Sequence, residues 1–107
     1  MNKIAYTVIC AITDKQKAAA WLKWLQDGHI QDVIAGGATQ ATIVQIDNTD
    51  NKDDTKTTYE VRYTFSDRAT YDAYICDHAP RLRDDGLKRF PPESGFSYNR
   101  TVGEIIG

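Results

Sequence analysis

Two histidines are the side chains of this sequence whose usual pKa lies nearest neutrality, which suits them to proton transfer. His29 and His78 are the only histidines among the 107 residues. Each follows an aromatic helical segment that ends at an aspartate, and the negative end of a helix favours the protonated imidazole. Both are candidate catalytic residues, for general acid–base chemistry or as ligands of a haem or metal. The alternative is a structural histidine that bonds a backbone carbonyl.

A basic turn next to His78 is a candidate binding site for an anion. Arg81 and Arg83 precede Lys88 and Arg89, and the planar guanidinium group matches a carboxylate or phosphate. The alternative is that these side chains pair within the chain, because positions 77, 84 and 85 of the same segment are aspartates.

Aromatic side chains are the third candidate set, because rings with a few polar groups form pockets for planar organic ligands. The candidate ligand contacts are Tyr59, Tyr63, Tyr98 and Trp24. Core packing beneath the helices is the alternative for the tyrosines, and also for Tyr6 and Trp21. Trp24 lies outside the apolar stripe of its helix, which predicts a place at an edge or interface.

The sequence contains no signature of a metal or cofactor. Two separated histidines lack the further ligands that zinc requires, and we expect Cys10 and Cys76 to be buried free thiols. Segment 47–56 is polar, but a calcium loop starting there would hold Lys52 and Thr58 where glycine and glutamate are needed. We read this segment as a hairpin loop, and we expect neither metal nor cofactor.

The hydrophobic pattern predicts four strands, at residues 4–12, 39–46, 57–65 and 96–106, with Gly103 as a bulge in the last. Two broken helices separate the first strand from the second and the third from the fourth. The resulting order β-α-β-β-α-β predicts an α+β, ferredoxin-like fold, in which both helices cover one face of a four-stranded antiparallel sheet.

Caps and breakers define the helices. Thr13 is expected to cap the first helix, which breaks near Gly28 and stops at the glycine pair 36–37. Ser66 or Asp67 caps the second helix, and Pro80 begins a new helical piece that runs to about residue 87.

The uncovered face of the sheet predicts self-association. The first strand contributes Ala5, Thr7, Ile9 and Ala11 to this face, which are mostly apolar, whereas the third strand contributes polar residues. A face that meets only water would be more polar. We therefore expect a homodimer in which two sheets face each other around a barrel-like enclosure.

Length and composition fit one soluble domain spanning residues 1–107. The net charge of −2, from 13 basic and 15 acidic residues, gives no footprint for nucleic acid or an acidic membrane surface. No apolar run approaches the roughly 18 residues that a membrane span needs. The apolar run 4–12 lacks the cleavage site of a signal peptide, so we expect a cytoplasmic protein.

Four segments carry a family resemblance: W-L-x-W-L…H-I-x-D-V at 21–33, T-Y-E-V-R-Y at 58–63, Y-x-x-x-H-A-P-R-L-R at 74–83, and R-F-P-P…Y-x-R-T at 89–101. Together they resemble the small bacterial proteins grouped as domain of unknown function 4286. That family is similar in outline to the dimeric α+β barrel superfamily, which includes cofactor-free monooxygenases, haem-linked enzymes and lactone isomerases. The resemblance implies the fold and dimerisation, and it assigns no catalytic residue.

The leading functional hypothesis is a non-catalytic or regulatory module, formed by a homodimer, that binds a small aromatic or anionic ligand. The alternative is a cofactor-free monooxygenase or isomerase for a hydrophobic aromatic substrate, with His78 or His29 carrying the proton. A third hypothesis is a protein-interaction module.

Overall fold

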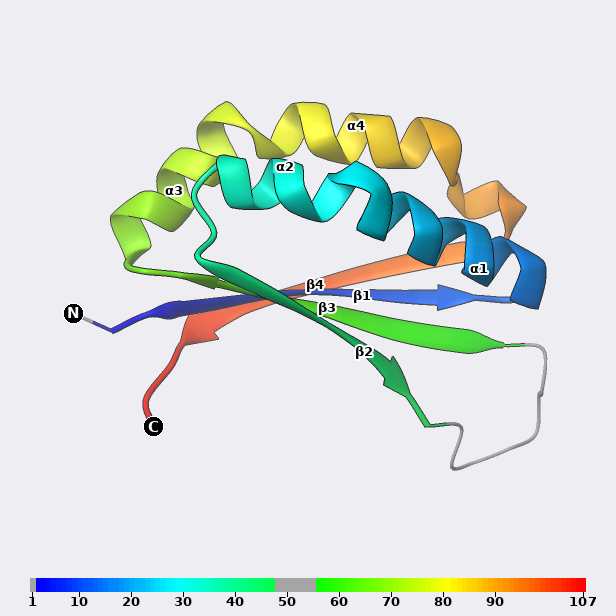
Figure 1. Ribbon diagram of the computed structural model, residues 1–107, viewed down its shortest axis with the longest axis horizontal. Helices are drawn as coiled ribbons and strands as arrows, with labels where there is room; N and C mark the ends of the chain where they lie inside the picture. Colours follow the sequence, from blue (N-terminus) through cyan, green and yellow to red (C-terminus); the bar gives the residue numbers. More distant parts are fainter. Residues whose placement is uncertain (1, 48–55) are drawn as a thin grey trace.

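The computed structural model describes residues 2–47 and 56–107. Its strands are β1 (Ile4–Ile12), β2 (Gln40–Ile46), β3 (Thr57–Phe65) and β4 (Phe96–Glu104). Its α-helices are α1 (Lys15–Trp24), α2 (Ile30–Ala35), α3 (Arg68–Asp77) and α4 (Ala79–Arg89), with a π-helical turn at Leu25–His29 and a 3₁₀ turn at Pro92–Ser94. The order is the predicted one, and Figure 1 shows the helices together above the sheet.

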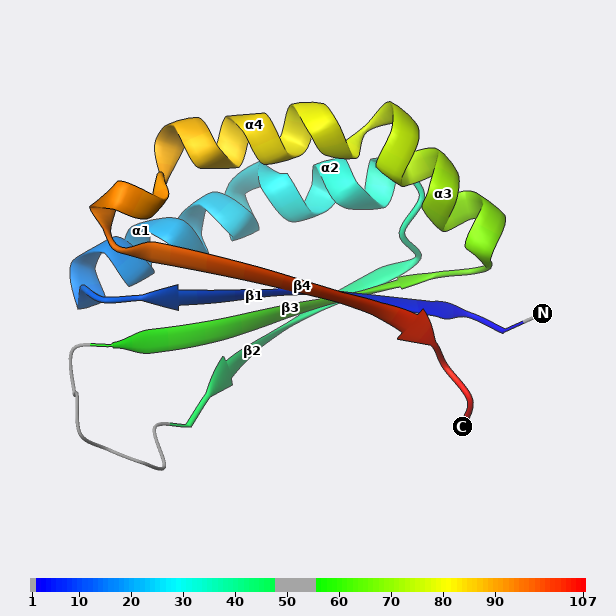
Figure 2. The same ribbon diagram turned by 180° about the vertical axis from the view of Figure 1, so that it is seen from behind.

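The sheet has the strand order β2-β3-β1-β4, and every neighbouring pair is antiparallel. All helices lie on one face of the sheet, as the opposite view in Figure 2 also shows. This arrangement confirms the ferredoxin-like α+β fold. β1 is a central strand, which explains why its residues are apolar on both faces.

The core lies between the helices and the sheet. Alternation places Tyr6 and Cys10 of β1, and Tyr63 and Phe65 of β3, beneath the helices, all nearly inaccessible to solvent. The helices contribute a further set of buried side chains: Trp21, Leu25, Val33, Tyr74 and Leu82. The sheet therefore has one buried face and one face that no element of the described chain covers (Figure 1).

Both helical segments break where the sequence predicts. Gly28 lies outside helical geometry (φ 169°, ψ −30°), within the π-helical turn that joins α1 to α2. Pro80 stands in the first turn of α4, immediately after His78 ends α3. Each break redirects the chain over the curved sheet, and the first places His29 beside the core.

The first helix cap differs from the prediction. Asp14, not Thr13, caps α1: its Oδ1 accepts hydrogen bonds from the backbone N–H of Gln16 (2.8 Å) and Lys17 (3.0 Å). Thr13 lies in the bend between β1 and α1, and its N–H donates to the Gly95 carbonyl oxygen at 3.2 Å. Asp67 caps α3, as predicted.

Three other expectations need correction or lie beyond the structure. Gly103 pairs with Ala5 in unbroken register, so β4 has no bulge there, and the strand ends at Glu104. Cys10 is a buried free thiol, but Cys76 is exposed because it lies on the outer side of α3. Most of the predicted hairpin loop, residues 48–55, lies outside the described residues.

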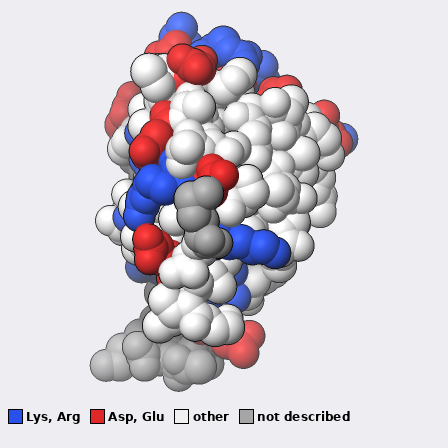
Figure 3. Space-filling model, turned by 90° about the vertical axis from the view of Figure 1, so that its left-hand side faces the viewer, with Lys and Arg blue, Asp and Glu red and all other residues white. Residues whose placement is uncertain are grey.

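The surface carries charges of both signs. On the end of the molecule shown in Figure 3, basic and acidic side chains intermingle, and neither sign forms a broad patch. Within residues 2–47 and 56–107, no helix is long and apolar enough to cross a membrane.

Candidate ligand-binding site

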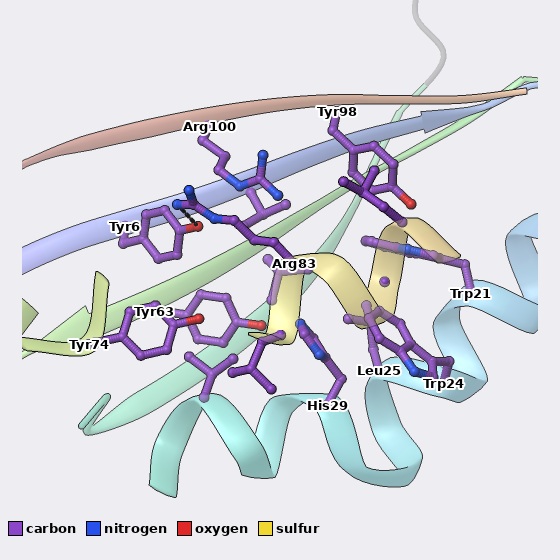
Figure 4. A pocket seen from close by; sticks show the side chains of 16 residues that line it. Tyr6, Trp21, Trp24, Leu25, His29, Tyr63, Tyr74, Arg83, Tyr98 and Arg100 are labelled. Carbon is purple, nitrogen blue, oxygen red and sulfur yellow. Dashed lines mark hydrogen bonds between the residues drawn. The ribbon is translucent and has the colours of Figure 1, made fainter. Parts of the chain in front are cut away.

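A cavity of about 50 Å³ lies between the helices and the covered face of the sheet (Figure 4). That volume holds about four water molecules. Aromatic and aliphatic side chains make up most of its wall: Tyr6, Val8, Trp21, Trp24, Leu25, Val33, Val61, Tyr63, Tyr74, Leu82, Leu87 and Tyr98, with His29, Arg83, Gly86 and Arg100 completing it. The exposed members, Leu87 on α4 and Arg100 on β4, mark where it opens.

The structure brings five of the eight sequence-derived candidates together in this cavity: Trp24, His29, Tyr63, Arg83 and Tyr98. The other three lie elsewhere. Tyr59 stacks on Trp21 in the core (ring centroids 5.8 Å apart), His78 packs beside Tyr74 at the junction of α3 and α4, and Arg81 is exposed on α4. Tyr59 therefore packs in the core, as the alternative interpretation of the tyrosines predicted, and does not line the cavity.

His29 is held in place by an aromatic stack. The π-helical turn presents its ring to the Trp24 indole, with 4.1 Å between ring centroids and 23° between ring planes. Burial lowers the pKa of His29 to about 4, although Asp32 and Asp85 act in the opposite direction. The imidazole is therefore neutral at pH 7, which corrects the expected imidazolium.

Trp24 forms one end of the cavity because α4 has a glycine opposite it. A Cβ at Gly86 would lie 3.1 Å from the Trp24 ring, so any larger residue would displace the indole. Glycine within a helix costs about 1 kcal/mol relative to alanine. Close contact with Trp24 is the local feature that requires glycine here.

Arg83 points inward from the basic turn, whereas its neighbours do not. Its Nη2 donates to the Tyr6 hydroxyl at 3.1 Å (Figure 4), and its Nε is buried without a hydrogen-bond partner among the described residues. Lys88 and Arg89 form ion pairs with Asp84 (2.9 Å) and Asp85 (3.1 Å). Intramolecular pairing therefore describes the outer part of the turn, but not Arg83.

Tyr63 and Tyr74 present neutral hydroxyl groups in the wall. Burial raises the pKa of Tyr74 to about 12 and raises that of Tyr63 further. Figure 4 shows both hydroxyls pointing toward the middle of the cavity. Tyr98 donates to the Phe90 carbonyl oxygen at 3.0 Å, and the buried Trp21 Nε1–H lies close to the Tyr98 hydroxyl.

Sequence reasoning missed Arg100, the second cation of the cavity. It pairs with Val8 across the β1–β4 ladder and therefore lies on the helix-covered face, opposite Arg83. The strict alternation of β4 after Phe96 could have placed it there. Among the described residues, no group of three or more histidine, cysteine, aspartate or glutamate side chains could hold a metal ion.

Comparison with known proteins identifies a family model and a fold. The model described as domain of unknown function (DUF4286) matches residues 3–102. A dimeric ferredoxin-like protein from an uncultured marine organism has a TM-score of 0.72 at 10% identity, covering 100% of this chain and 98% of its own. No curated protein matches the sequence.

Two further solved structures share the fold. SnoaB, a cofactor-independent oxygenase from Streptomyces nogalater, has a TM-score of 0.68 at 7% identity, covering 100% of this chain and 96% of its own. A putative antibiotic biosynthesis monooxygenase from Bacillus cereus has a TM-score of 0.67 at 6% identity, with coverage of 100% and 96%. At such identities the similarity establishes the fold alone.

Proposed function

The chain belongs to the family of domain of unknown function 4286, and we propose that it binds a small aromatic molecule in the cavity between its helices and its sheet. The observation that carries this proposal is the wall itself, in which four tyrosines, two tryptophans and a neutral histidine surround one space. Planar rings contact such walls closely and lose hydration on entry. At about 50 Å³ the cavity is smaller than the roughly 150 Å³ known to hold a benzene ring, so a ring enters only when the exposed Leu87 and Arg100 side chains move outward.

Binding is favoured over catalysis by the state of His29. An imidazole with a pKa of about 4 is a weak proton acceptor at neutral pH. The other histidine, His78, lies outside the cavity wall. The side chains thus offer ring contacts and hydrogen-bond donors rather than a strong base.

Native mass spectrometry of freshly purified protein tests the proposal. We expect a reproducible extra mass, and fragmentation of the released compound gives its chemical class. Titration with benzyl alcohol then locates the site, because Trp21 and Trp24 are the only tryptophans and both line the cavity.

Gly86→Ala provides the site-directed comparison. Its methyl group would displace the Trp24 ring, so we expect weaker binding of benzyl alcohol, about tenfold. The fold should persist, because alanine favours the helix. Unchanged tryptophan fluorescence in the wild type up to the solubility limit of the probe, with no extra mass, would refute binding in this cavity.

A cofactor-independent oxygenase is the second candidate, favoured by the fold shared with SnoaB over the whole chain. In this case the tyrosines would position a phenolic substrate and His29 would accept its proton, with dioxygen reduced as the ring is oxidised. Oxygen uptake in the presence of the identified ligand, lost in His29→Gln, would support catalysis over binding alone.

We further propose that two copies associate through the open face of the sheet. Val44 and Ile46 of β2, with Ala5, Ile9 and Ala11 of β1, lie on this face and are only partly exposed. Two structures of the same fold are described as dimeric. In such a dimer the cavity of each chain lies on the outer side of its own sheet, rather than in an enclosure between the sheets.

A further inference from the structure

We infer that the ligand of this cavity carries an oxyanion on its aromatic ring, a carboxylate or phenolate, which Arg83 and Arg100 bind. This inference rests on the proposed function and adds the chemical class of the ligand. It comes from the polar groups of the wall, whereas the binding proposal comes from the rings.

The first step is the unmatched donor. Arg83 Nε is buried and has no hydrogen-bond partner within the described residues. Burying a hydrogen-bond donor without a partner costs free energy, and the cost is larger when the donor belongs to a charged group. The hydrogen bond from Nη2 to the Tyr6 hydroxyl restrains the guanidinium group beside the cavity.

The second step is the absence of a counter-ion. Arg83 and Arg100 form no salt bridge with any residue of the described chain, although Lys88 and Arg89 on the same helix are paired. No acidic residue lines the described cavity wall. The two cations approach one space from α4 and β4 (Figure 4), and an anion between them would replace their mutual repulsion with attraction.

The third step is the polarity of the remaining groups. The Tyr63 and Tyr74 hydroxyls point into the cavity and can donate. The set therefore consists of donors and cations, with the neutral His29 ring as the exception. An oxyanion can accept hydrogen bonds from these donors and neutralise the two cations, whereas a neutral ring leaves Arg83 Nε–H without an acceptor.

The placement of charge and rings also orients the ligand. Arg83 and Arg100 lie together beside Tyr6, while Trp21 and Trp24 lie at the other end of the cavity (Figure 4). The oxyanion therefore binds between the two arginines, and the ring extends toward the tryptophans. Benzoate has this shape, and benzamide is its neutral match.

Isothermal titration calorimetry with benzoate and benzamide tests the inference, with tryptophan fluorescence confirming the site. We expect benzoate to bind at least tenfold more tightly than benzamide, since hydrogen bonds between charged partners are the stronger kind. Arg100→Gln should weaken benzoate binding about tenfold and leave benzamide binding unchanged. Arg83→Gln should do the same.

Arg81→Gln is the matched control, because Arg81 is an exposed arginine of the same helix that does not line the cavity. We expect its affinity for benzoate to equal that of the wild type. Arg100 lies on an edge strand and is exposed, so Arg100→Gln gives an answer even if Arg83→Gln fails to fold.

Two results would overturn the inference, and they differ in what they leave standing. Equal affinities for benzoate and benzamide, or no effect of either arginine variant, would remove the oxyanion and retain the aromatic site. No binding of benzoate, benzamide or benzyl alcohol would remove the aromatic site as well.

Discussion

His29 shows at the scale of one residue how the fold determines chemistry. The sequence places it after a helical segment, where the helix dipole favours a protonated ring. In the structure its ring stacks on Trp24 at the edge of the core, and partial burial lowers its pKa to about 4. The loss of hydration therefore lowers the pKa of His29 by more than the helix end and the carboxylates of Asp32 and Asp85 raise it.

The lowered pKa predicts a stability loss in mild acid. The unfolded imidazole takes up a proton below its usual pKa of 6.5, whereas the folded one does so only near 4. The unfolded state thus binds more protons in this window, so the stabilisation is complete above pH 6.5 and is lost as pH falls toward 4. Between pH 7 and pH 5 the wild type should lose up to about 2 kcal/mol.

Urea unfolding at these two pH values measures the effect in matched variants. His29→Gln should lose less stability than the wild type on acidification, because glutamine does not titrate. His78→Gln, which removes the other histidine and leaves the cavity wall intact, should retain the wild-type loss. Equal pH dependence in the wild type and His29→Gln would contradict a buried, neutral His29.

At the scale of secondary structure, the first turn of α1 shows which competing signal determines a helix start. Thr13 and Gln16 have the spacing of a capping box, yet Asp14 provides the cap. The N–H of Thr13, which a capping box would pair with the Gln16 side chain, donates instead to the Gly95 carbonyl oxygen. A contact distant in sequence thus moved the cap by one position.

Asp14→Ala should therefore destabilise the protein by about 1 kcal/mol, the usual cost of removing a helix cap. Thr13→Ala, its neighbour and control, should stay within about 0.5 kcal/mol of the wild type, as exposed substitutions usually do. Thermal or urea unfolding of the two variants provides the comparison. A larger loss for Thr13→Ala than for Asp14→Ala would show that threonine caps the helix in solution.

Local patterns predicted the elements well, because alternation and breakers act over a few residues. β1 and β3 have the predicted bounds, and Gly28 and Pro80 break the helices as expected. The cavity was less predictable, since it depends on which distant elements meet. Arg100 resembles an ordinary charge of an edge strand, and only the β1–β4 register places it opposite Arg83.

At the scale of the whole molecule, the two faces of the sheet differ in what covers them and in the side chains they carry. The covered face contributes to the core and the cavity, whereas the open face carries mainly small, hydroxyl and aliphatic side chains and the ion pair Arg62–Glu60. Ile9 lies near its centre, between Glu60 on β3 and Asn99 on β4. An aliphatic residue on a central strand of an open face gains most from a second sheet packed against it.

Ile9→Lys should therefore convert the proposed dimer to a monomer. The monomer tolerates the change, because Glu60 is the cross-strand neighbour of position 9 and attracts the lysine. The dimer does not, because the substitution would bury two like charges at a face-to-face contact. Gln45→Lys is the control: Gln45 is exposed on β2 and pairs with Tyr59, so it lies on the opposite face.

Light scattering after size-exclusion chromatography measures the mass of each variant. We expect the wild type and Gln45→Lys to have twice the chain mass of 12.0 kDa, and Ile9→Lys to have the chain mass itself. Benzyl alcohol binding should survive in the Ile9→Lys monomer, because the cavity lies on the other side of the sheet. A dimeric Ile9→Lys variant would direct the search for the interface to the exposed edges of β2 and β4 instead.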